Sequence, residues 1–145
     1  MKAAAPALLL STLLVLPAAR AGDARATGEP LRLAQADSGR ELALPVGARL
    51  RVALDSNPST GADWQRRDGF AGVLRSVPCE GERRRPLVVA GEPAPPVGSP
   101  VDVVYCFEAT APGKAWLYLA YGRVWQAEAP PWQTFRLEID VVPAP

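Results

Sequence analysis

A strict two-residue alternation near the C-terminal end constrains the fold of this chain most. Over residues 135–141, four apolar side chains (Phe135, Leu137, Ile139, Val141) alternate with three charged ones (Arg136, Glu138, Asp140). Because the side chains of a β-strand point alternately to opposite faces, this pattern predicts a strand with one face buried. Sixteen prolines among the 145 residues argue against long helices. The sequence therefore predicts an all-β protein.

Shorter stretches of the same kind recur along the chain. Alternation is clear over residues 49–54, 101–109 and 115–121, and shorter candidate strands lie at 31–33, 41–44, 72–77 and 86–89. Turn-forming residues separate these segments, and the apolar residues do not follow a helical spacing. About seven to eight short strands with turns between them predict a β-sandwich.

Residues 1–21 have the three parts of a signal peptide. Lys2 gives a positive start, residues 7–16 form an apolar run, and Ala19-Arg20-Ala21 offers a cleavage site, with Ala24-Arg25-Ala26 as an alternative. The apolar run is too short for a membrane anchor, and no cysteine follows it to carry a lipid. We therefore expect the protein to be exported, to the periplasm or outside the cell.

Removal of the signal peptide leaves one domain with almost no net charge. Lys2 and Arg20 are lost, so the 16 basic residues become 14, against 15 acidic ones. This balance provides no basic face for nucleic acid, and we interpret Arg83-Arg84-Arg85 as a solvated loop. We expect a flexible leader at residues 22–37, a single domain at residues 38–145, and a monomer.

Histidine and cysteine usage narrows the chemistry further. The chain has no histidine, which removes most metal sites and most catalytic triads. We expect no cofactor and no enzymatic activity, because no spacing of acidic residues singles out an acid–base pair. Cys79 and Cys106 predict a structural disulfide in an exported domain. Since Cys106 alternates with the inward side chains of its strand, the disulfide is expected on an outer face.

The segment Ser56-Asn57-Pro58-Ser59-Thr60-Gly61 predicts a stiff loop between two strands. Pro58 fixes its own φ and keeps Asn57 extended, and Gly61 takes a positive φ at little cost. A loop that is rigid before binding loses little conformational entropy when it meets a partner. The alternative is an ordinary turn, because Asn-Pro and Ser-Thr-Gly are common in loops.

The order Asn57-Pro58-Ser59-Thr60-Gly61, followed by Trp64, resembles the signature Asn-Pro-Thr-Thr-Gly-aromatic-x-Trp of the chagasin family, inhibitors of papain-like cysteine peptidases. A glycine-containing loop at residues 97–100 comes next in the family's order. A later strand ends in Arg123-Val124-Trp125, which is similar to the family's Arg-Pro-Trp. The resemblance covers most of the chain after about residue 38 and implies an immunoglobulin-like sandwich.

The resemblance also implies a mechanism in which three loops at one end of the sandwich block the cleft of a peptidase. Residues 57–61 would lie over the catalytic cysteine, where the hydroxyls of Ser59 and Thr60 would meet polar groups. Gly98 and Ser99 of the second loop, and Arg123 and Trp125 of the third, would grip the cleft walls. Trp64 is expected in the core.

Three departures from the family pattern predict weaker inhibition or different target peptidases. Ala62 replaces an aromatic residue, which removes a hydrophobic contact beside the first loop. The second loop has Gly98-Ser99-Pro100 in place of Gly-x-Gly-Gly, and Val124 replaces the proline of the third loop.

Other functions and other placements stay open at this point. An exported sandwich could bind carbohydrate or envelope proteins by stacking on Trp116, Trp125 and Trp132, which lie near predicted strand ends. A family member that has lost inhibition could serve as a protein-interaction module. For Trp125 the alternative is local packing at a strand end, and Trp132 is either exposed or packed beneath its loop.

Overall fold

The computed structural model describes residues 28–67, 69–70, 72–79, 91, 93, 96 and 98–144. These residues form eight strands and two single-turn 3-10 helices. In chain order they are β1 (Leu31–Leu33), η1 (Gln35–Asp37), β2 (Arg40–Pro45), β3 (Arg49–Ser56), η2 (Pro58–Thr60), β4 (Ala62–Arg66), β5 (Leu74–Val77), β6 (Val101–Ala109), β7 (Gly113–Arg123) and β8 (Gln133–Val142). The all-β prediction is confirmed.

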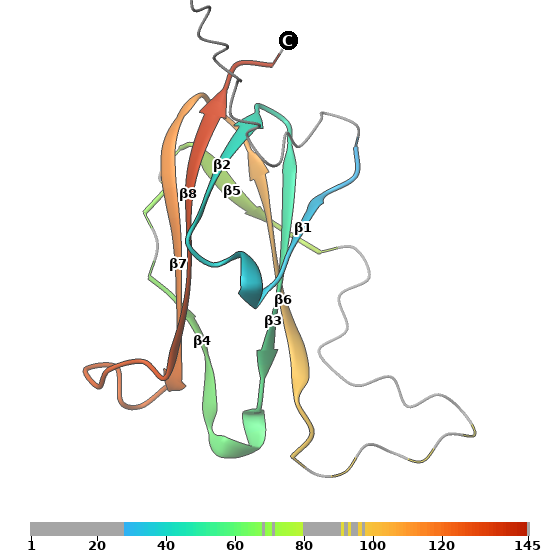
Figure 1. Ribbon diagram of the computed structural model, residues 1–145, viewed down its shortest axis with the longest axis vertical. Coiled ribbons are helices and arrows are strands. Elements are labelled where there is room, and N and C mark those ends of the chain that lie inside the picture. Colours follow the sequence, from blue (N-terminus) through green and yellow to red (C-terminus); the bar gives the residue numbers. More distant parts are fainter. Residues whose placement is uncertain are drawn as a thin grey trace, which may run out of the picture.

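The strands form two four-stranded sheets that face each other (Figure 1). We call the sheet with the order β1-β3-β6-β5 sheet A, and the sheet with the order β2-β8-β7-β4 sheet B. Neighbouring strands are antiparallel, except that β1 runs parallel to β3 and β2 runs parallel to β8. The architecture is an immunoglobulin-like β-sandwich, as the sequence predicts.

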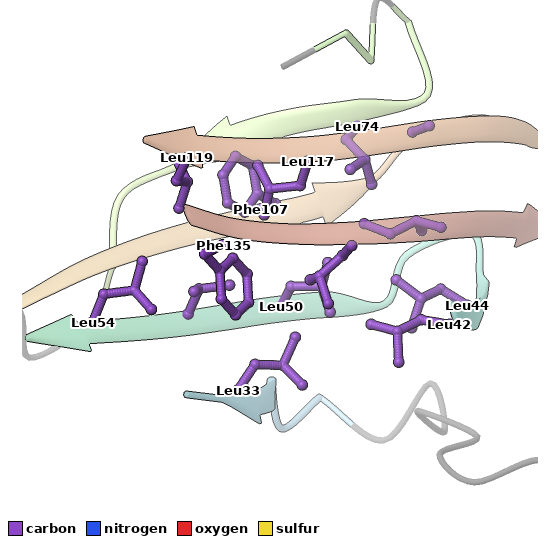
Figure 2. Packing of buried hydrophobic residues seen from close by; sticks show 14 of the residues in the cluster. Leu33, Leu42, Leu44, Leu50, Leu54, Leu74, Phe107, Leu117, Leu119 and Phe135 are labelled. Atoms are coloured by element: carbon purple, nitrogen blue, oxygen red, sulfur yellow. The ribbon is translucent and has the colours of Figure 1, made fainter. Parts of the chain in front are cut away.

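The core lies between the sheets, where leucines and phenylalanines from both inner faces meet (Figure 2). The alternation over residues 135–141 has its cause here, because the four apolar side chains of β8 are buried and the three charged ones are exposed. Burial of one such side chain stabilises the fold by roughly 1.5–3 kcal/mol. The sandwich therefore forms a rigid support for the loops at its ends.

The domain begins earlier than the sequence predicts. Residues 31–37 were assigned to a leader, but β1 pairs with β3, with Leu31 opposite Leu50, and Leu33 is buried in the core. The turn η1 then carries the chain from sheet A to sheet B. The candidate strand at residues 31–33 is therefore confirmed as β1, and the domain boundary at residue 38 leaves out a segment that belongs to the sandwich.

Asp37 fixes the turn η1 between the two sheets. Its carboxylate accepts hydrogen bonds from the backbone N–H of Ala34, at 2.9 Å, and from the guanidinium of Arg40. The hydrogen bond from Ala34, and then the hydrogen bond and the charge of Arg40, lower the pKa of Asp37 below its ordinary value, although partial burial acts in the opposite direction. The ionised carboxylate thus stabilises the turn that connects sheet A to sheet B.

The predicted disulfide between Cys79 and Cys106 is present, with the two Cα atoms 5.3 Å apart. Cys106 lies in the middle of β6, and Cys79 lies two residues beyond β5, its neighbour in sheet A. Phe107 and Val103 of β6 are buried, whereas Cys106 is half-buried on the opposite face of that strand. The bridge therefore joins neighbouring strands on the outer face of one sheet, and does not connect the two sheets.

Some expectations concern residues outside the described part of the chain. These are the signal peptide at residues 1–21, the run Arg83-Arg84-Arg85, and the candidate strand at residues 86–89. Among the described residues, no helix has both the length and the apolar character that crossing a membrane requires.

Candidate functional site

Three connections lie together at one end of the sandwich, at the bottom of Figure 1. We call residues 57–61, between β3 and β4, the first loop. Residues 98–100, just before β6, are the second loop, and residues 124–132, between β7 and β8, are the third loop. The site residues that the sequence predicts lie in these three connections, except Arg123, which is the last residue of β7.

Strand pairing explains why the first loop lies between the other two. In sheet A, Ser56 at the end of β3 pairs with Val101 at the start of β6, which places the second loop beside it. In sheet B, Ala62 at the start of β4 pairs with Arg123 at the end of β7, which places the third loop beside it. The first loop crosses from one sheet to the other, so it has a neighbour on each side.

The first loop is a tight turn held by its own hydrogen bonds. Pro58, Ser59 and Thr60 form the 3-10 turn η2, which Gly61 ends with φ +71°. The backbone N–H and the hydroxyl of Thr60 both donate to the carbonyl of Asn57, at 3.1 and 2.7 Å. The N–H of Gly61 donates to the carbonyl of Pro58 at 3.0 Å. The turn has the proline and the positive-φ glycine that the sequence predicts, and its internal hydrogen bonds support the expected stiffness.

The two hydroxyls of the first loop serve the loop itself, which differs from the role expected for them. Ser59 donates to the side-chain oxygen of Asn57, and Thr60 donates to the Asn57 carbonyl. The Thr60 hydroxyl also accepts the N–H of Ala62 at 3.3 Å. Because both O–H donors are engaged within the loop, their first effect is to fix its shape.

The second loop is connected to the first through Asn57. The amide nitrogen of the Asn57 side chain donates to the carbonyl of Gly98 at 3.0 Å. Gly98 has φ +91°, and a Cβ built there would lie 3.5 Å from the hydroxyl oxygen of Ser59. Ser99 is turned back on its own segment, since its hydroxyl donates to the carbonyl of Pro96 at 2.7 Å. Gly98 thus contacts the first loop, and Ser99 shapes the second.

Trp125 of the third loop lies against the first loop. A Cβ built at Gly61 would come within 2.7 Å of the Cζ3 atom of Trp125, so the indole occupies the space that glycine leaves open. The indole nevertheless remains 64% exposed. Trp125 therefore combines both interpretations given for it, because it packs locally and still presents a large apolar surface.

The rest of the third loop folds back on the outer face of sheet B. It contains two turns, in which Gln126 and Ala129 donate N–H groups to the carbonyls of Arg123 and Gln126, both at 3.0 Å. A cavity of about 20 Å³ remains beneath it, lined by Gln65, Arg67 and Ala120 of the sheet and by Ala129, Pro130, Pro131 and Trp132 of the loop, among others. This is room for about one water molecule, so the loop packs closely on the sheet.

Arg123 and Trp132 form the base of the third loop. The guanidinium carbon of Arg123 lies 5.5 Å from the centre of the Trp132 ring, a cation–π arrangement. Trp132 also meets Tyr121 edge-on, with ring centres 6.0 Å apart, yet about half of its surface stays exposed. Trp132 is therefore partly exposed and partly packed, and Arg123 lies beside it at the surface.

Two residues of this region were not predicted from the sequence. Tyr121 accepts a hydrogen bond from Asn57, and Arg67 donates one from its guanidinium to the carbonyl of Ala127, at 2.9 Å, in the third loop. Both bonds connect residues about 60 positions apart. A sequence pattern gives no signal for such contacts, because they depend on how the strands pair.

Ala62 and Trp64 lie inside the sandwich. Trp64 is buried, as expected, and its indole N–H donates to the carbonyl of Asp55 at 2.9 Å. Ala62 is 1% exposed and belongs to the core, so position 62 does not lie on the surface beside the first loop. The departure at Ala62 therefore changes packing beneath the loop rather than an exposed contact.

The tryptophans do not form one stacking platform. Trp116 lies near the start of β7, seven positions from Arg123, or roughly 23 Å along a strand. Its indole covers Gly69, where a built Cβ would lie 2.7 Å from the Cζ2 atom of the ring. Trp125 and Trp132 belong to the opposite end of the same strand pair. The arrangement does not support the carbohydrate-binding alternative.

In the part of the chain that the structure describes, no group of three His, Cys, Asp or Glu side chains is placed to hold a metal ion. The three loops offer shape, rigidity and aromatic surface.

Comparison with known proteins agrees with this geometry. Residues 43–139 match the sequence profile described as chagasin family peptidase inhibitor I42. No curated protein sequence matches the chain significantly.

Three solved structures are similar. The cysteine protease inhibitor EhICP2 from Entamoeba histolytica is 17% identical with a TM-score of 0.60, over 77% of this chain and 94% of that one. Amebosin is 23% identical with a TM-score of 0.54, over 79% of this chain and all of that one (100%). PbICP-C, solved in complex with falcipain-2, is 14% identical with a TM-score of 0.47, over 79% of this chain and 92% of that one.

At these identities, the first two structures show a shared fold. The family assignment rests on the sequence profile, which spans more than half of the chain. The protein belongs to the chagasin family of peptidase inhibitors.

Proposed function

We propose that this protein is a reversible, competitive inhibitor of papain-like cysteine peptidases, and that its three loops fill the active-site cleft. The observation that carries the proposal is the placement of the first loop between the other two, at one end of a sandwich from a peptidase-inhibitor family. A rigid loop that projects between two flanking loops has a shape that can fill a peptidase cleft and contact both of its walls. Such a protein needs no catalytic group of its own.

The first loop suits the centre of the cleft because it is rigid and compact. A peptidase cleaves a bond only when the carbonyl reaches a near-attack geometry, and a small misplacement prevents the reaction. Internal hydrogen bonds of the 3-10 turn hold the carbonyls of Asn57 and Pro58 in place. Asn57, which bonds to Gly98 of the second loop and to Tyr121 of β7, and Gly61, which ends the turn, complete this wedge. The loop therefore occupies the site without being cut.

The second and third loops supply the grip on the cleft walls. Gly98 and Ser99 present backbone beside the first loop, and Trp125 presents a mostly exposed indole on its other side. Tryptophan and arginine are the residues that most often dominate interface energy, so Trp125 and Arg123 are the expected anchors. The contact is made by loops on a rigid support, which limits the entropy cost of binding.

We also propose that the protein is exported. The sequence of residues 1–21 has the form of a signal peptide, and the Cys79–Cys106 disulfide supports an oxidising compartment, where such bonds persist. The inhibitor then meets peptidases in the periplasm or outside the cell.

Titration of the mature protein, from residue 22, against papain tests the proposal. We expect competitive inhibition, in which the apparent inhibition constant rises with substrate concentration. A double variant, Thr60→Ala with Trp125→Ala, is expected to lose most of it while keeping the sandwich. A folded, disulfide-bonded parent that leaves papain and cathepsin L-type peptidases fully active at micromolar excess overturns the proposal.

A further inference from the structure

Tyr121 belongs to none of the three loops, yet it contacts two of them and is linked to the other. It lies near the end of β7, and its side chain points into the sandwich with 8% of its surface exposed. The ring is tilted against Trp64, with centres 5.2 Å apart, and meets Trp132 of the third loop edge-on. Such burial leaves the ring no direct contact with a partner protein.

The hydroxyl of Tyr121 holds the first residue of the first loop. Its oxygen accepts a hydrogen bond from the backbone N–H of Asn57 at 2.9 Å. Asn57 lies one residue beyond Ser56, the last residue of β3 that pairs with β6. The phenol oxygen thus takes the place of a strand acceptor at the point where the chain leaves sheet A. It determines where the turn starts.

Through Asn57, the bond to Tyr121 also affects the rest of the first loop and the second loop. Its carbonyl accepts both bonds from Thr60, which close the turn, and its side-chain amide donates to Gly98 of the second loop. Displacement of Asn57 therefore displaces the wedge and also removes the support of the second loop.

The third loop depends on Tyr121 through its last residue. The backbone N–H of Trp132 donates to the carbonyl of Tyr121 at 2.8 Å, beside the edge-on contact of the two rings. One residue of β7 is thus connected to all three loops, directly to the first and third and through Asn57 to the second.

We propose that Tyr121 is a positioning residue for inhibition, which acts through Asn57 and holds the three loops in one pre-formed arrangement. The proposal rests on the proposed function of the loops as a peptidase-binding surface. When a binding-competent arrangement is only partly populated, apparent affinity falls by that fraction. A residue that acts in this way therefore changes the rate of association, whereas loss of a direct contact chiefly raises the rate of dissociation.

Replacement Tyr121→Phe tests this role, because it keeps the ring contacts with Trp64 and Trp132 and removes only the acceptor for Asn57. We expect the association rate constant with papain to fall about tenfold and the dissociation rate constant to stay within about twofold. Hydrogen exchange of the Asn57 and Thr60 amides in the free protein should become faster.

Tyr105→Phe is the matched control. The hydroxyl of Tyr105, on β6, also bridges the two sheets, since it donates at 3.1 Å to the carbonyl of Trp64, a residue of strand β4. We expect both rate constants of this variant to equal those of the parent.

Two outcomes overturn the proposal. One is an unchanged exchange rate at Asn57 in Tyr121→Phe, and the other is a loss of affinity that comes entirely from faster dissociation. If the parent does not inhibit papain at all, the proposed function falls, but exchange at Asn57 still decides the positioning role. The two failures are therefore distinguishable.

Discussion

The first and third loops lie side by side at the same end of the sandwich, but they are held in different ways. The first is a five-residue turn with hydrogen bonds among its own members, from Asn57 to Gly61. The third loop is nine residues long, from 124 to 132, and relies on contacts with other parts of the fold. Trp125 rests on Gly61, Trp132 rests on Tyr121, and Ala127 is bonded to Arg67.

The difference shows two routes to a pre-formed binding surface. A short polar turn closes through hydrogen bonds among its own residues, with Tyr121 of β7 fixing the point where it starts, so its rigidity does not depend on the third loop. A longer loop loses more entropy on ordering and needs apolar and charged groups from the neighbouring sheet to hold it. Changes within the first loop should therefore have large effects on inhibition, and changes at the supports of the third should have smaller ones.

The largest effect is expected at Gly61, where the two loops touch. In Gly61→Ala the new Cβ collides with the indole of Trp125, and the left-handed backbone costs about 1–2 kcal/mol. Both loops must shift, and we expect the inhibition constant for papain to rise about 100-fold, equivalent to about 2.7 kcal/mol. Steady-state inhibition assays measure this change.

Gly47→Ala is the matched control for backbone strain. Gly47 lies in the turn between β2 and β3, at the opposite end, with φ +89° and no atom within 4 Å of a built Cβ. It carries a similar strain without the collision, so its inhibition constant should equal that of the parent. Equal losses in both variants would mean that strain alone explains the effect at Gly61.

Removal of the exposed indole is the next largest change. Trp125→Ala should raise the inhibition constant about 30-fold, because a central tryptophan typically contributes about 2 kcal/mol to an interface. The free energy of unfolding should change little, since the side chain is mostly exposed. Trp116→Ala, at the far end of β7, should inhibit as the parent does. Faster amide exchange at Thr60 in Trp125→Ala would contradict the independence of the first loop.

The support of the third loop can be weakened without touching either loop. Arg67→Met keeps the length of the side chain and removes the donor to the Ala127 carbonyl, so we expect the third loop to become more mobile. The inhibition constant should rise only about threefold, the equivalent of a hydrogen bond worth about 0.7 kcal/mol. Backbone relaxation of residues 124–132 measures the mobility. Arg75→Met, on β5, removes an exposed contact with Glu108 of β6 and should leave both quantities unchanged.

The smallest effect on inhibition is expected at Asp37, far along the chain from both loops. Asp37→Asn removes the negative charge to which the Ala34 N–H and the Arg40 guanidinium donate. It should lower the free energy of unfolding by about 1 kcal/mol at neutral pH. Because folding lowers the pKa of Asp37, its contribution is complete above the unfolded pKa and is lost as pH falls through the folded value. Denaturation curves should therefore converge in acid, while inhibition by the two proteins stays equal. A pH-independent difference in stability would contradict this origin.

The fold and the first loop were largely predictable because their determinants are local. Alternation along Phe135–Val141 follows from the two-residue repeat of a strand, and Pro58 and Gly61 fix the turn through their own backbone preferences. The disulfide followed from the presence of two cysteines in a chain expected to be exported.

The supports of the loops were not predictable from one sequence. The bonds of Tyr121 to Asn57 and of Arg67 to Ala127 join residues about 60 positions apart, and their geometry depends on the register of β4 with β7. The buried position of Ala62 did follow from the sequence, because two-residue alternation puts residue 62 on the same face as Trp64, which was expected in the core. The three-residue strand β1 was too short to reveal its pairing.

The pairing of β2 with β8 has a consequence for how the chain reaches its final state. Residues 40–45 find their partners only at residues 137–142, so sheet B stays incomplete until that distant segment is available. Contacts between such distant segments form late, because a long loop must close before they contribute. Under the export that we propose, this topology keeps the chain from folding before β8 is available. The third loop, which ends at β8, takes its place only after that strand has joined the sheet.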